Sequence, residues 1–323
     1  AVGYVYPRIN FDWILFNEAT KRVEKNDGYV IQNFRVKNVL IDKNENNQII
    51  GIKGTKGDKE YEFFAPLTIG AGGVNCPISK ATITDIYKES FIEKKHWSSA
   101  FRQYWKNVEN INYEKGAIEF HYIDGVIPGY FWIFPAGGRT ANIGVGLLKS
   151  KVKKKSKKLH EILNQVISSN NFKKRFKDSR PLEKPKGWNL PFGNIRRNNH
   201  GDGYMLLGDA AGLVDPFTGE GIGNALESGK IAADVIFSSK ANNGFSKTDL
   251  SIYDKKLWDY LGSELDTSTL LLKLANHKIL LNFVIDRASR NDKVRNVISG
   301  MLANEVPKTE LSNPLFYLKT LFS

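Results

Sequence analysis

The stretch GYMLLGDAAGLVDPFTGEGIGNA, residues 203–225, decides the fold of this chain. It opens with Tyr204 to Leu207, a short apolar run of the kind that forms a strand buried on both faces. Asp209 follows this run, and glycines at 219, 221 and 223 then open a helix-patterned region. A strand, a carboxylate, a glycine-rich turn and a helix in this order are typical of α/β folds that bind ligands at the carboxyl ends of their strands.

Each part of this stretch suits a flavin nucleotide. A carboxylate such as Asp209 accepts hydrogen bonds from ribitol or ribose hydroxyls. Gly219, Gly221 and Gly223 carry no Cβ, so their backbone allows close approach of a flat ring. The helix after them begins with free N–H groups and a partial positive charge, which suits the N1–C2=O edge where a reduced flavin gathers negative charge. Tight packing of a strand on a helix also uses glycines, but the length of the combined signature favours the flavin.

Composition narrows the class of protein. The 323 residues are 41% hydrophobic and 12% aromatic, enough for a sizeable core in one large or two fused domains. Cys76 is the single cysteine, which excludes an intramolecular disulfide and indicates a reducing, cytoplasmic setting. No run approaches the roughly 20 apolar residues that a membrane-spanning helix needs. The five histidines are scattered without metal-ligand spacing, so we expect no metal site.

The net charge of +13 is concentrated most densely in residues 150–158, which contain six lysines and no aromatic residue. Such a run is typical of a solvated loop or helix start. Because no nucleic-acid-binding signature accompanies it, we expect no nucleic-acid partner.

The remaining pattern predicts a mixed α/β (α+β) fold. After Asn10, a capping residue type, apolar residues at every fourth position predict an amphipathic helix over 12–24. Two groups of short strands follow, and residues from Gly219 onward are almost entirely helix-patterned. The strands of the first group are expected at 29–41, 48–54, 60–64 and 67–70, and those of the second at 100–105, 117–122, 130–134 and 140–147. The polar residues 150–180 are expected to be helical.

In residues 203–225 the chain resembles the FAD-dependent oxidoreductase superfamily that includes p-hydroxybenzoate hydroxylase, whose members carry Gly-Asp followed by Pro-x-x-Gly-x-Gly. The resemblance implies that Asp209 binds the FAD ribose and that Pro216 to Gly223 lies along the isoalloxazine. Residues 8–19 also resemble the family's helix opening R-x-x-F-D-x-x-L-x-x-x-A. The cofactor-binding residues implied are Arg8, Gly208, Asp209, Pro216, Gly219, Gly221, Ile222 and Gly223.

Two further stretches resemble geranylgeranyl reductases. GYFWIFP at 129–135 is an aromatic strand that ends at a proline, and ANIGVG at 141–146 follows it. Tyr130, Trp132 and Phe134 share one face of their strand and, with Cys76, are the expected substrate pocket. Cys76 has the alternative of being a small core residue.

The sequence departs from the family at three places. Ala136 stands where the family usually has lysine, and Gly70-Ala71-Gly72-Gly73 lacks the aspartate of the Gly-Ala-Asp-Gly motif, which argues against an NADPH-dependent hydroxylase. No G-x-G-x-x-G motif ends a first strand. We therefore expect an N-terminal segment to be missing, and the sequence as given to bind FAD weakly.

The resemblance implies a partial Rossmann-like FAD-binding domain (1–97 and 187–240), interleaved with an antiparallel β substrate domain (98–186) and followed by a helical C-terminal region (241–323). It implies a reductase of C=C bonds in a prenyl lipid or prenyl diphosphate, with NAD(P)H or ferredoxin as electron donor; the residues single out no proton donor. Two alternatives stay open: a flavin monooxygenase or halogenase of the same fold, and a noncatalytic lipid-binding module. The apolar residues 315–322 favour core packing, with peripheral attachment to the inner face of a membrane as the alternative.

Overall fold

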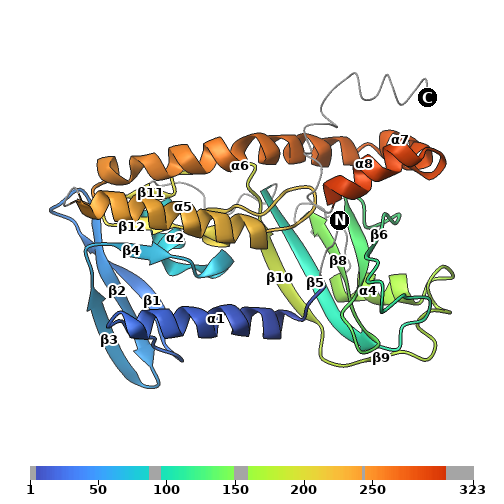
Figure 1. The fold of residues 1–323 in the computed structure, drawn as a ribbon, viewed down its shortest axis with the longest axis horizontal. Helices are drawn as coiled ribbons and strands as arrows, with labels where there is room; N and C mark the ends of the chain where they lie inside the picture. The colour runs from blue at the N-terminus through green and yellow to red at the C-terminus, as the bar shows by residue number, and fades with distance from the viewer. Residues whose placement is uncertain (1–4, 87–95, 149–158, 242–243, 303–323) are drawn as a thin grey trace. The chain divides into compact units, whose positions relative to one another are not determined.

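The computed structural model of the protein describes residues 5–86, 96–148, 159–241 and 244–302, and combines helices with antiparallel sheets, as the sequence predicts (Figure 1). Within these residues the chain divides into two compact units. Unit 1 draws on Arg35–Ser98 and the residues from Asn189 onward, whereas unit 2 draws on the residues up to Phe34 and on Ser99–Trp188. The lysine run and residues 315–322 lie outside the described residues.

The predicted cuts at 97/98 and 186/187 fall one or two residues from the junctions between the units. Two groupings differ from the expectation. Residues up to Phe34 belong with unit 2, and the helices after residue 241 belong with unit 1. The second difference has a plain cause, because leucines of the longest of these helices are buried in the same core as Met205 and Leu206.

Unit 1 contains two small sheets and most of the helices. Its strands are β1 (Arg35–Asp42), β2 (Gln48–Lys56), β3 (Lys59–Phe64), β4 (Thr68–Gly70), β11 (His200–Gly201) and β12 (Tyr204–Leu206). Its helices are α2 (Pro77–Ala81), α5 (Ile222–Ala241), α6 (Lys247–Ala275), α7 (Lys278–Arg290) and α8 (Asp292–Leu302), with short turns η1 (Gly73–Asn75), η2 (Thr82–Ile86) and η4 (Gly208–Ala211). The first sheet is the predicted meander, in the order β1-β2-β3, and the second has the order β11-β12-β4.

The pairing of β12 with β4 is parallel and places the deciding stretch beside a distant segment of the chain. Tyr204 lies opposite Thr68, and Leu206 lies opposite Gly70. Helix α6 supports this pair, since the hydroxyl of Tyr253 donates to the Leu206 carbonyl at 2.9 Å. Burial raises the pKa of Tyr253, so its hydroxyl keeps the proton that it donates. The carboxyl ends of β4 and β12 therefore lie side by side, and Asp209 follows shortly after the end of β12.

Unit 2 is built on one antiparallel sheet. Its elements are α1 (Arg8–Lys25), β5 (Trp97–Lys106), β6 (Glu119–His121), β7 (Gly129–Pro135), β8 (Thr140–Leu148), α4 (Leu159–Ile167), β9 (Arg180–Pro181) and β10 (Lys186–Pro191). The strand order is β10-β5-β8-β7-β6, and β9 pairs with β5. One face of the sheet is a core, because Phe131, Ile133 and Ile143 are fully buried together with Leu163 of α4. By strand alternation, the residues between them lie on the opposite face.

Helix α1 begins earlier than the sequence predicts. Its N-cap is Pro7, whose φ of −58° leads into the helix, and Asn10 lies in the first turn, where its N–H donates to the Pro7 carbonyl. The prediction that Asn10 caps the helix is therefore wrong. Proline is tolerated at a helix start because the first backbone N–H groups have no partner there in any case.

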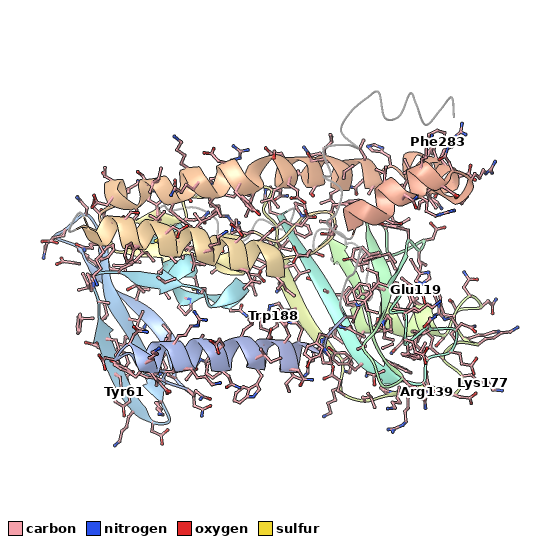
Figure 2. The ribbon with its side chains drawn as sticks, in the orientation of Figure 1. Tyr61, Glu119, Arg139, Lys177, Trp188 and Phe283 are labelled. Atoms are coloured by element: carbon pink, nitrogen blue, oxygen red, sulfur yellow. The ribbon has the colours of Figure 1, made fainter. Side chains whose placement is uncertain are left out.

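Glu119, labelled in Figure 2, anchors β6 to the loop after α4. Burial alone would raise its pKa, but hydrogen bonds from Arg175 at 2.7 and 2.8 Å and from His121 at 2.8 Å outweigh burial and lower the pKa to about 2. A depressed carboxyl pKa stabilises the fold at pH values above the ordinary value of 4.5, and this stability is lost as the pH falls towards 2.

Replacing Glu119 with glutamine is therefore expected to lower the free energy of unfolding by about 2–3 kcal/mol at pH 7 and to flatten its pH dependence between 4.5 and 2. Urea titrations at several pH values measure both effects. Glu18→Gln is the control, since its ion pair with Arg22 lies exposed on α1 and contributes little. Equal losses in the two variants would contradict the assignment.

Candidate functional site

Asp209 and the glycine-rich turn lie side by side in unit 1. Asp209 is half-buried in η4, directly after β12. Gly208 has a φ of +56°, which favours glycine, and its N–H donates to the Ser228 hydroxyl at 3.0 Å. A methyl group on Gly221 would lie only 3.3 Å from Oδ1 of Asp209. The two parts of the predicted motif therefore meet, and a side chain at position 221 would crowd the carboxylate.

Asp215 holds the turn together, a role that the sequence analysis missed. Its Oδ1 accepts from the Phe217 N–H at 2.9 Å, from the Thr218 N–H at 2.8 Å and from the Thr218 hydroxyl at 3.0 Å. Its Oδ2 accepts from the Ser268 hydroxyl of α6 at 2.6 Å. The first three bonds follow a local pattern in which Asp caps the backbone two and three residues onward, so the Asp-Pro-Phe-Thr spacing was a usable signal. The bond from Ser268 had no such signal.

Glu220 occupies part of the start of α5. Its Oε1 accepts from the Gly223 N–H at 2.8 Å, and Asn224 donates its side-chain amide to the Leu213 carbonyl at 2.7 Å. Gly219 has a φ of +73°, while Ile222 and Gly223 are exposed. The start of α5 is the predicted binding site for the N1–C2=O edge of the flavin. In the structure, the Glu220 carboxylate already accepts a hydrogen bond there.

These residues fit FAD. Asp209 offers a half-buried acceptor for sugar hydroxyls beside Gly221, where the backbone carries no side chain. Pro216 is buried, and Ile222 and Gly223 at the start of α5 are exposed, with Glu220 as the group that a ring placed there would meet. The assignment of Gly208, Asp209, Pro216, Gly219, Gly221, Ile222 and Gly223 to the cofactor stays a prediction that this geometry supports.

The surroundings of two further predicted site residues, Arg8 and Cys76, are described within their own units, and the prediction for Arg8 stays untested. Arg8 belongs to unit 2, where its exposed guanidinium donates to both carboxylate oxygens of Asp12 at 2.8 and 3.0 Å. Cys76 is 1% exposed and lies in the core of unit 1 with Ile78 and Leu206. This burial favours the alternative of a small core residue for Cys76, and its place in a substrate pocket stays a prediction.

Tyr130, Trp132 and Phe134 form a continuous row of half-buried rings on β7. The centroid of Trp132 lies 5.9 Å from that of Tyr130 and 6.2 Å from that of Phe134. Phe120 of β6 bridges the row from the next strand, with its centroid 5.1 Å from Tyr130 and 5.3 Å from Phe134. We call Phe120, Tyr122, Tyr130, Trp132 and Phe134 the aromatic face.

Phe120 is not among the predicted pocket residues, and its place opposite Trp132 is set by the pairing of β6 with β7. The ring centroids of Tyr122 and Tyr130 lie 6.5 Å apart. Burial raises the pKa of Tyr122 to about 12. Trp105, by contrast, packs its ring edge against Phe176 in the core of unit 2. The aromatic face is therefore apolar in character and distinct from that core.

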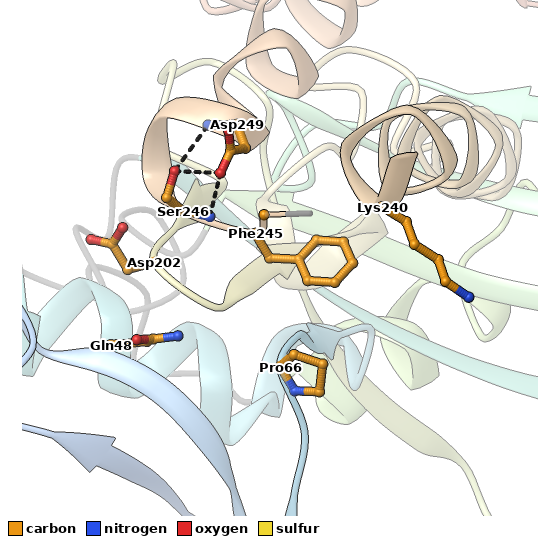
Figure 3. Close-up of a pocket in the computed structure, with 8 residues that line it drawn as sticks. Gln48, Pro66, Asp202, Lys240, Phe245, Ser246 and Asp249 are labelled. Atoms are coloured by element: carbon orange, nitrogen blue, oxygen red, sulfur yellow. Dashed lines mark hydrogen bonds between the residues drawn. The ribbon is translucent and has the colours of Figure 1, made fainter. Parts of the chain in front are cut away.

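A cavity of about 450 Å³ lies at the other end of β4 and β12 (Figure 3). It is lined by Gln48, Pro66, Asp202, Lys240, Gly244, Phe245, Ser246 and Asp249. Its polar groups serve the start of α6, since the Ser246 hydroxyl donates to Asp249 at 2.6 Å and the Lys247 N–H donates to Asp202 at 2.7 Å. We interpret this cavity as part of a capped helix junction.

Sequence comparison places unit 2 in a known family. The family model of the geranylgeranyl reductase catalytic domain matches residues 97–188. A digeranylgeranylglycerophospholipid reductase of Methanococcus vannielii is 30% identical over 99% of this chain and 76% of its own length. The chain belongs to the geranylgeranyl reductase family. Digeranylgeranylglycerophospholipid reductase 2 of Methanococcoides burtonii is 34% identical over 84% of this chain, but only 61% of the relative is covered.

Solved structures agree with this family in their fold. A geranylgeranyl bacteriochlorophyll reductase-like protein of Thermoplasma acidophilum matches 99% of the present chain. The match covers 72% of the Thermoplasma chain, with a TM-score of 0.76 and 21% identity. The flavin-dependent brominase Bmp2 matches with a TM-score of 0.63 and 20% identity over 87% of this chain and 68% of its own. At these identities the likeness concerns the fold alone.

The chain spans about three fifths of the length of the Methanococcoides burtonii relative, so the activity of the whole protein is a matter for proposal. Among the described helices, none has both the length and the hydropathy needed to cross a membrane. The described residues also contain no group of three or more His, Cys, Asp or Glu side chains that could hold a metal ion.

Proposed function

We propose that this protein is an FAD-dependent reductase that saturates C=C bonds of a geranylgeranyl-type isoprenoid chain. The observation that carries the proposal is the aromatic face, which lies within the residues matched by the geranylgeranyl reductase catalytic domain. An isoprenoid chain has no hydrogen-bonding groups along its length, so the surface that complements it is apolar. The names of the curated relatives, which are reductases of digeranylgeranyl lipids, support the same substrate class.

The residues of the chain divide the work in this proposal. FAD, when bound and reduced, would supply a hydride to the alkene. Asp209 would accept hydrogen bonds from sugar hydroxyls, and the turn from Pro216 to Gly223 would bring backbone close to the ring. Trp132 and its neighbours on the aromatic face would orient the chain and keep water from it. We further infer an external electron donor, either NAD(P)H or ferredoxin, and contact with the cytoplasmic face of a membrane where a lipid substrate resides.

The test uses the protein expressed from the complete reading frame of its gene. The protein is loaded with FAD, reduced anaerobically and mixed with a digeranylgeranylglycerophospholipid, whose mass is then followed. A gain of about two mass units per double bond is expected, because a hydride and a proton are added. Asp209→Ala is expected to weaken FAD binding about 10- to 100-fold, since it removes a charged hydrogen-bond acceptor.

Each other outcome points to a different activity. If the flavin binds and is reduced while the mass of the lipid stays constant, the reductase proposal fails, and oxygen-dependent chemistry of the monooxygenase or halogenase kind becomes the leading idea. If flavin binding is not observed, the noncatalytic lipid-binding alternative takes its place. Asp234→Ala, on the exposed side of α5, is the matched control for Asp209→Ala.

A further inference from the structure

Strand β8 presents almost no side chains beside the aromatic face. In the β7–β8 register, Tyr130 lies opposite Gly146, Trp132 opposite Gly144, and Phe134 opposite Asn142. The two glycines leave room that large cross-strand neighbours would fill, and an aromatic ring commonly covers a glycine in this arrangement. Asn142 is thus the one residue of the three on β8 that offers a functional group to this face.

The indole of Trp132 lies directly on Gly144. A methyl group on Gly144 would overlap Cζ2 of the indole and lie 2.6 Å from Cη2, whereas a methyl group on Gly146 would lie 3.8 Å from the nearest atom, Cζ3. The indole N–H donates to Oδ1 of Asn142 at 3.2 Å. Contacts with Tyr130 and Phe134 flank the ring. Its orientation is therefore set by one hydrogen bond and by the shape of the strand beneath it.

This hydrogen bond matters for what the aromatic face can bind. The indole N–H is a donor without acceptor capacity, and covering it with hydrocarbon costs free energy unless it keeps a partner. Water satisfies an uncovered indole, but an isoprenoid chain has no acceptor to replace that water. Asn142 supplies the acceptor from within the sheet, so the ring is able to present an apolar surface.

We propose that Asn142 is a positioning residue that fixes the Trp132 indole and pairs its N–H, so that the aromatic face accepts an isoprenoid chain. The proposal rests on the proposed function, since it concerns the same substrate. It assigns a role to a residue that the sequence motif alone marked only as the start of an Asn-x-Gly-x-Gly strand.

The test measures binding of geranylgeraniol, an uncharged isoprenoid alcohol, to the full protein and its variants. Asn142→Leu keeps the size of the side chain and removes the acceptor, and it is expected to weaken binding about five- to tenfold. Trp132→Phe keeps an aromatic ring and removes the donor. In the Trp132→Phe background, Asn142→Leu should change the dissociation constant by no more than about twofold, because the pair it breaks is already absent.

Two further variants separate this role from a merely structural one. Trp188→Phe alters an exposed tryptophan of β10, and in that background Asn142→Leu should have its full effect. Asn142→Gln keeps an uncharged amide oxygen as an acceptor and should bind geranylgeraniol more tightly than Asn142→Leu does. Thermal unfolding, followed by circular dichroism, checks that all variants are folded.

The results overturn the proposal if Asn142→Leu binds normally, if it weakens binding equally with and without the indole N–H, or if Asn142→Gln is as weak as Asn142→Leu. Failure of the proposed function has a different signature. In that case the original protein itself does not bind geranylgeraniol, whatever residue stands at position 142.

Discussion

Replacing Asp215 with alanine is expected to lower the free energy of unfolding by about 3–5 kcal/mol. Asp215 is 2% exposed, and its carboxylate accepts four hydrogen bonds, three from the turn that follows it and one from Ser268 of α6. Alanine removes the acceptor for all four donors and leaves a small void. Because Gly219 and Gly221 follow in the same turn, the variant is also expected to lose FAD binding.

Urea unfolding followed by circular dichroism measures the loss, and two variants calibrate it. Ser268→Ala removes one of the four bonds and should cost about 1 kcal/mol. Asp215→Asn keeps the Oδ1 acceptor that serves Phe217 and Thr218, so its cost should fall between the other two. If Asp215→Ala is no worse than Ser268→Ala, the turn does not depend on the carboxylate.

Local patterns predicted the parts of the fold that local physics decides. The strands β2, β3, β7, β8 and β12 lie within two residues of the positions that alternation and apolar runs predicted. Strand β1 begins at Arg35, six residues after the predicted start at 29, and the helix predicted over 150–180 is limited, among the described residues, to α4 (Leu159–Ile167). The shared face of Tyr130, Trp132 and Phe134 follows from the period of two along a strand, and their ring contacts confirm it.

The remainder depends on contacts between distant residues. Strand β10 was not predicted, because Lys186–Pro191 lacks a clear alternation and is defined by its pairing with β5. The bond from Ser268 to Asp215 joins residues 53 positions apart, and the core position of Cys76 depends on Leu206. No local pattern carries such information, so the sequence located the glycine-rich turn without revealing that α6 helps to hold it.

The same distinction applies to the aromatic strand and its neighbour. The motif predicted large residues on β7 and glycines on β8, but the reason for the glycines appears only in the pairing. Trp132 lies across Gly144, and Asn142 receives its N–H. A sequence pattern that looks like two separate strands is therefore one packed unit, whose members should be substituted together or in matched pairs.

Gly144→Ala should accordingly be far more harmful than Gly146→Ala, although the two glycines lie two residues apart on the same face of β8. A methyl group on Gly144 would overlap the Trp132 indole and lie 2.5 Å from the carbonyl oxygen of Phe101 on β5. We expect a loss of about 3 kcal/mol for Gly144→Ala, as for other overpacked sites. At Gly146 the nearest atom is 3.8 Å away, so alanine there should be neutral or slightly stabilising, since it lowers the entropy of the unfolded chain.

Combining Gly144→Ala with Trp132→Ala identifies which clash dominates. The indole is a side chain and its removal relieves that overlap, whereas the Phe101 carbonyl belongs to the backbone and moves only if β5 and β8 separate. We therefore expect Trp132→Ala to rescue Gly144→Ala only in part, as judged by urea midpoints of the two single variants and the double variant. Full rescue would show that the strands tolerate a side chain at 144 and that the indole alone requires glycine there; equal stability of Gly144→Ala and Gly146→Ala would contradict the packing of Trp132 on β8.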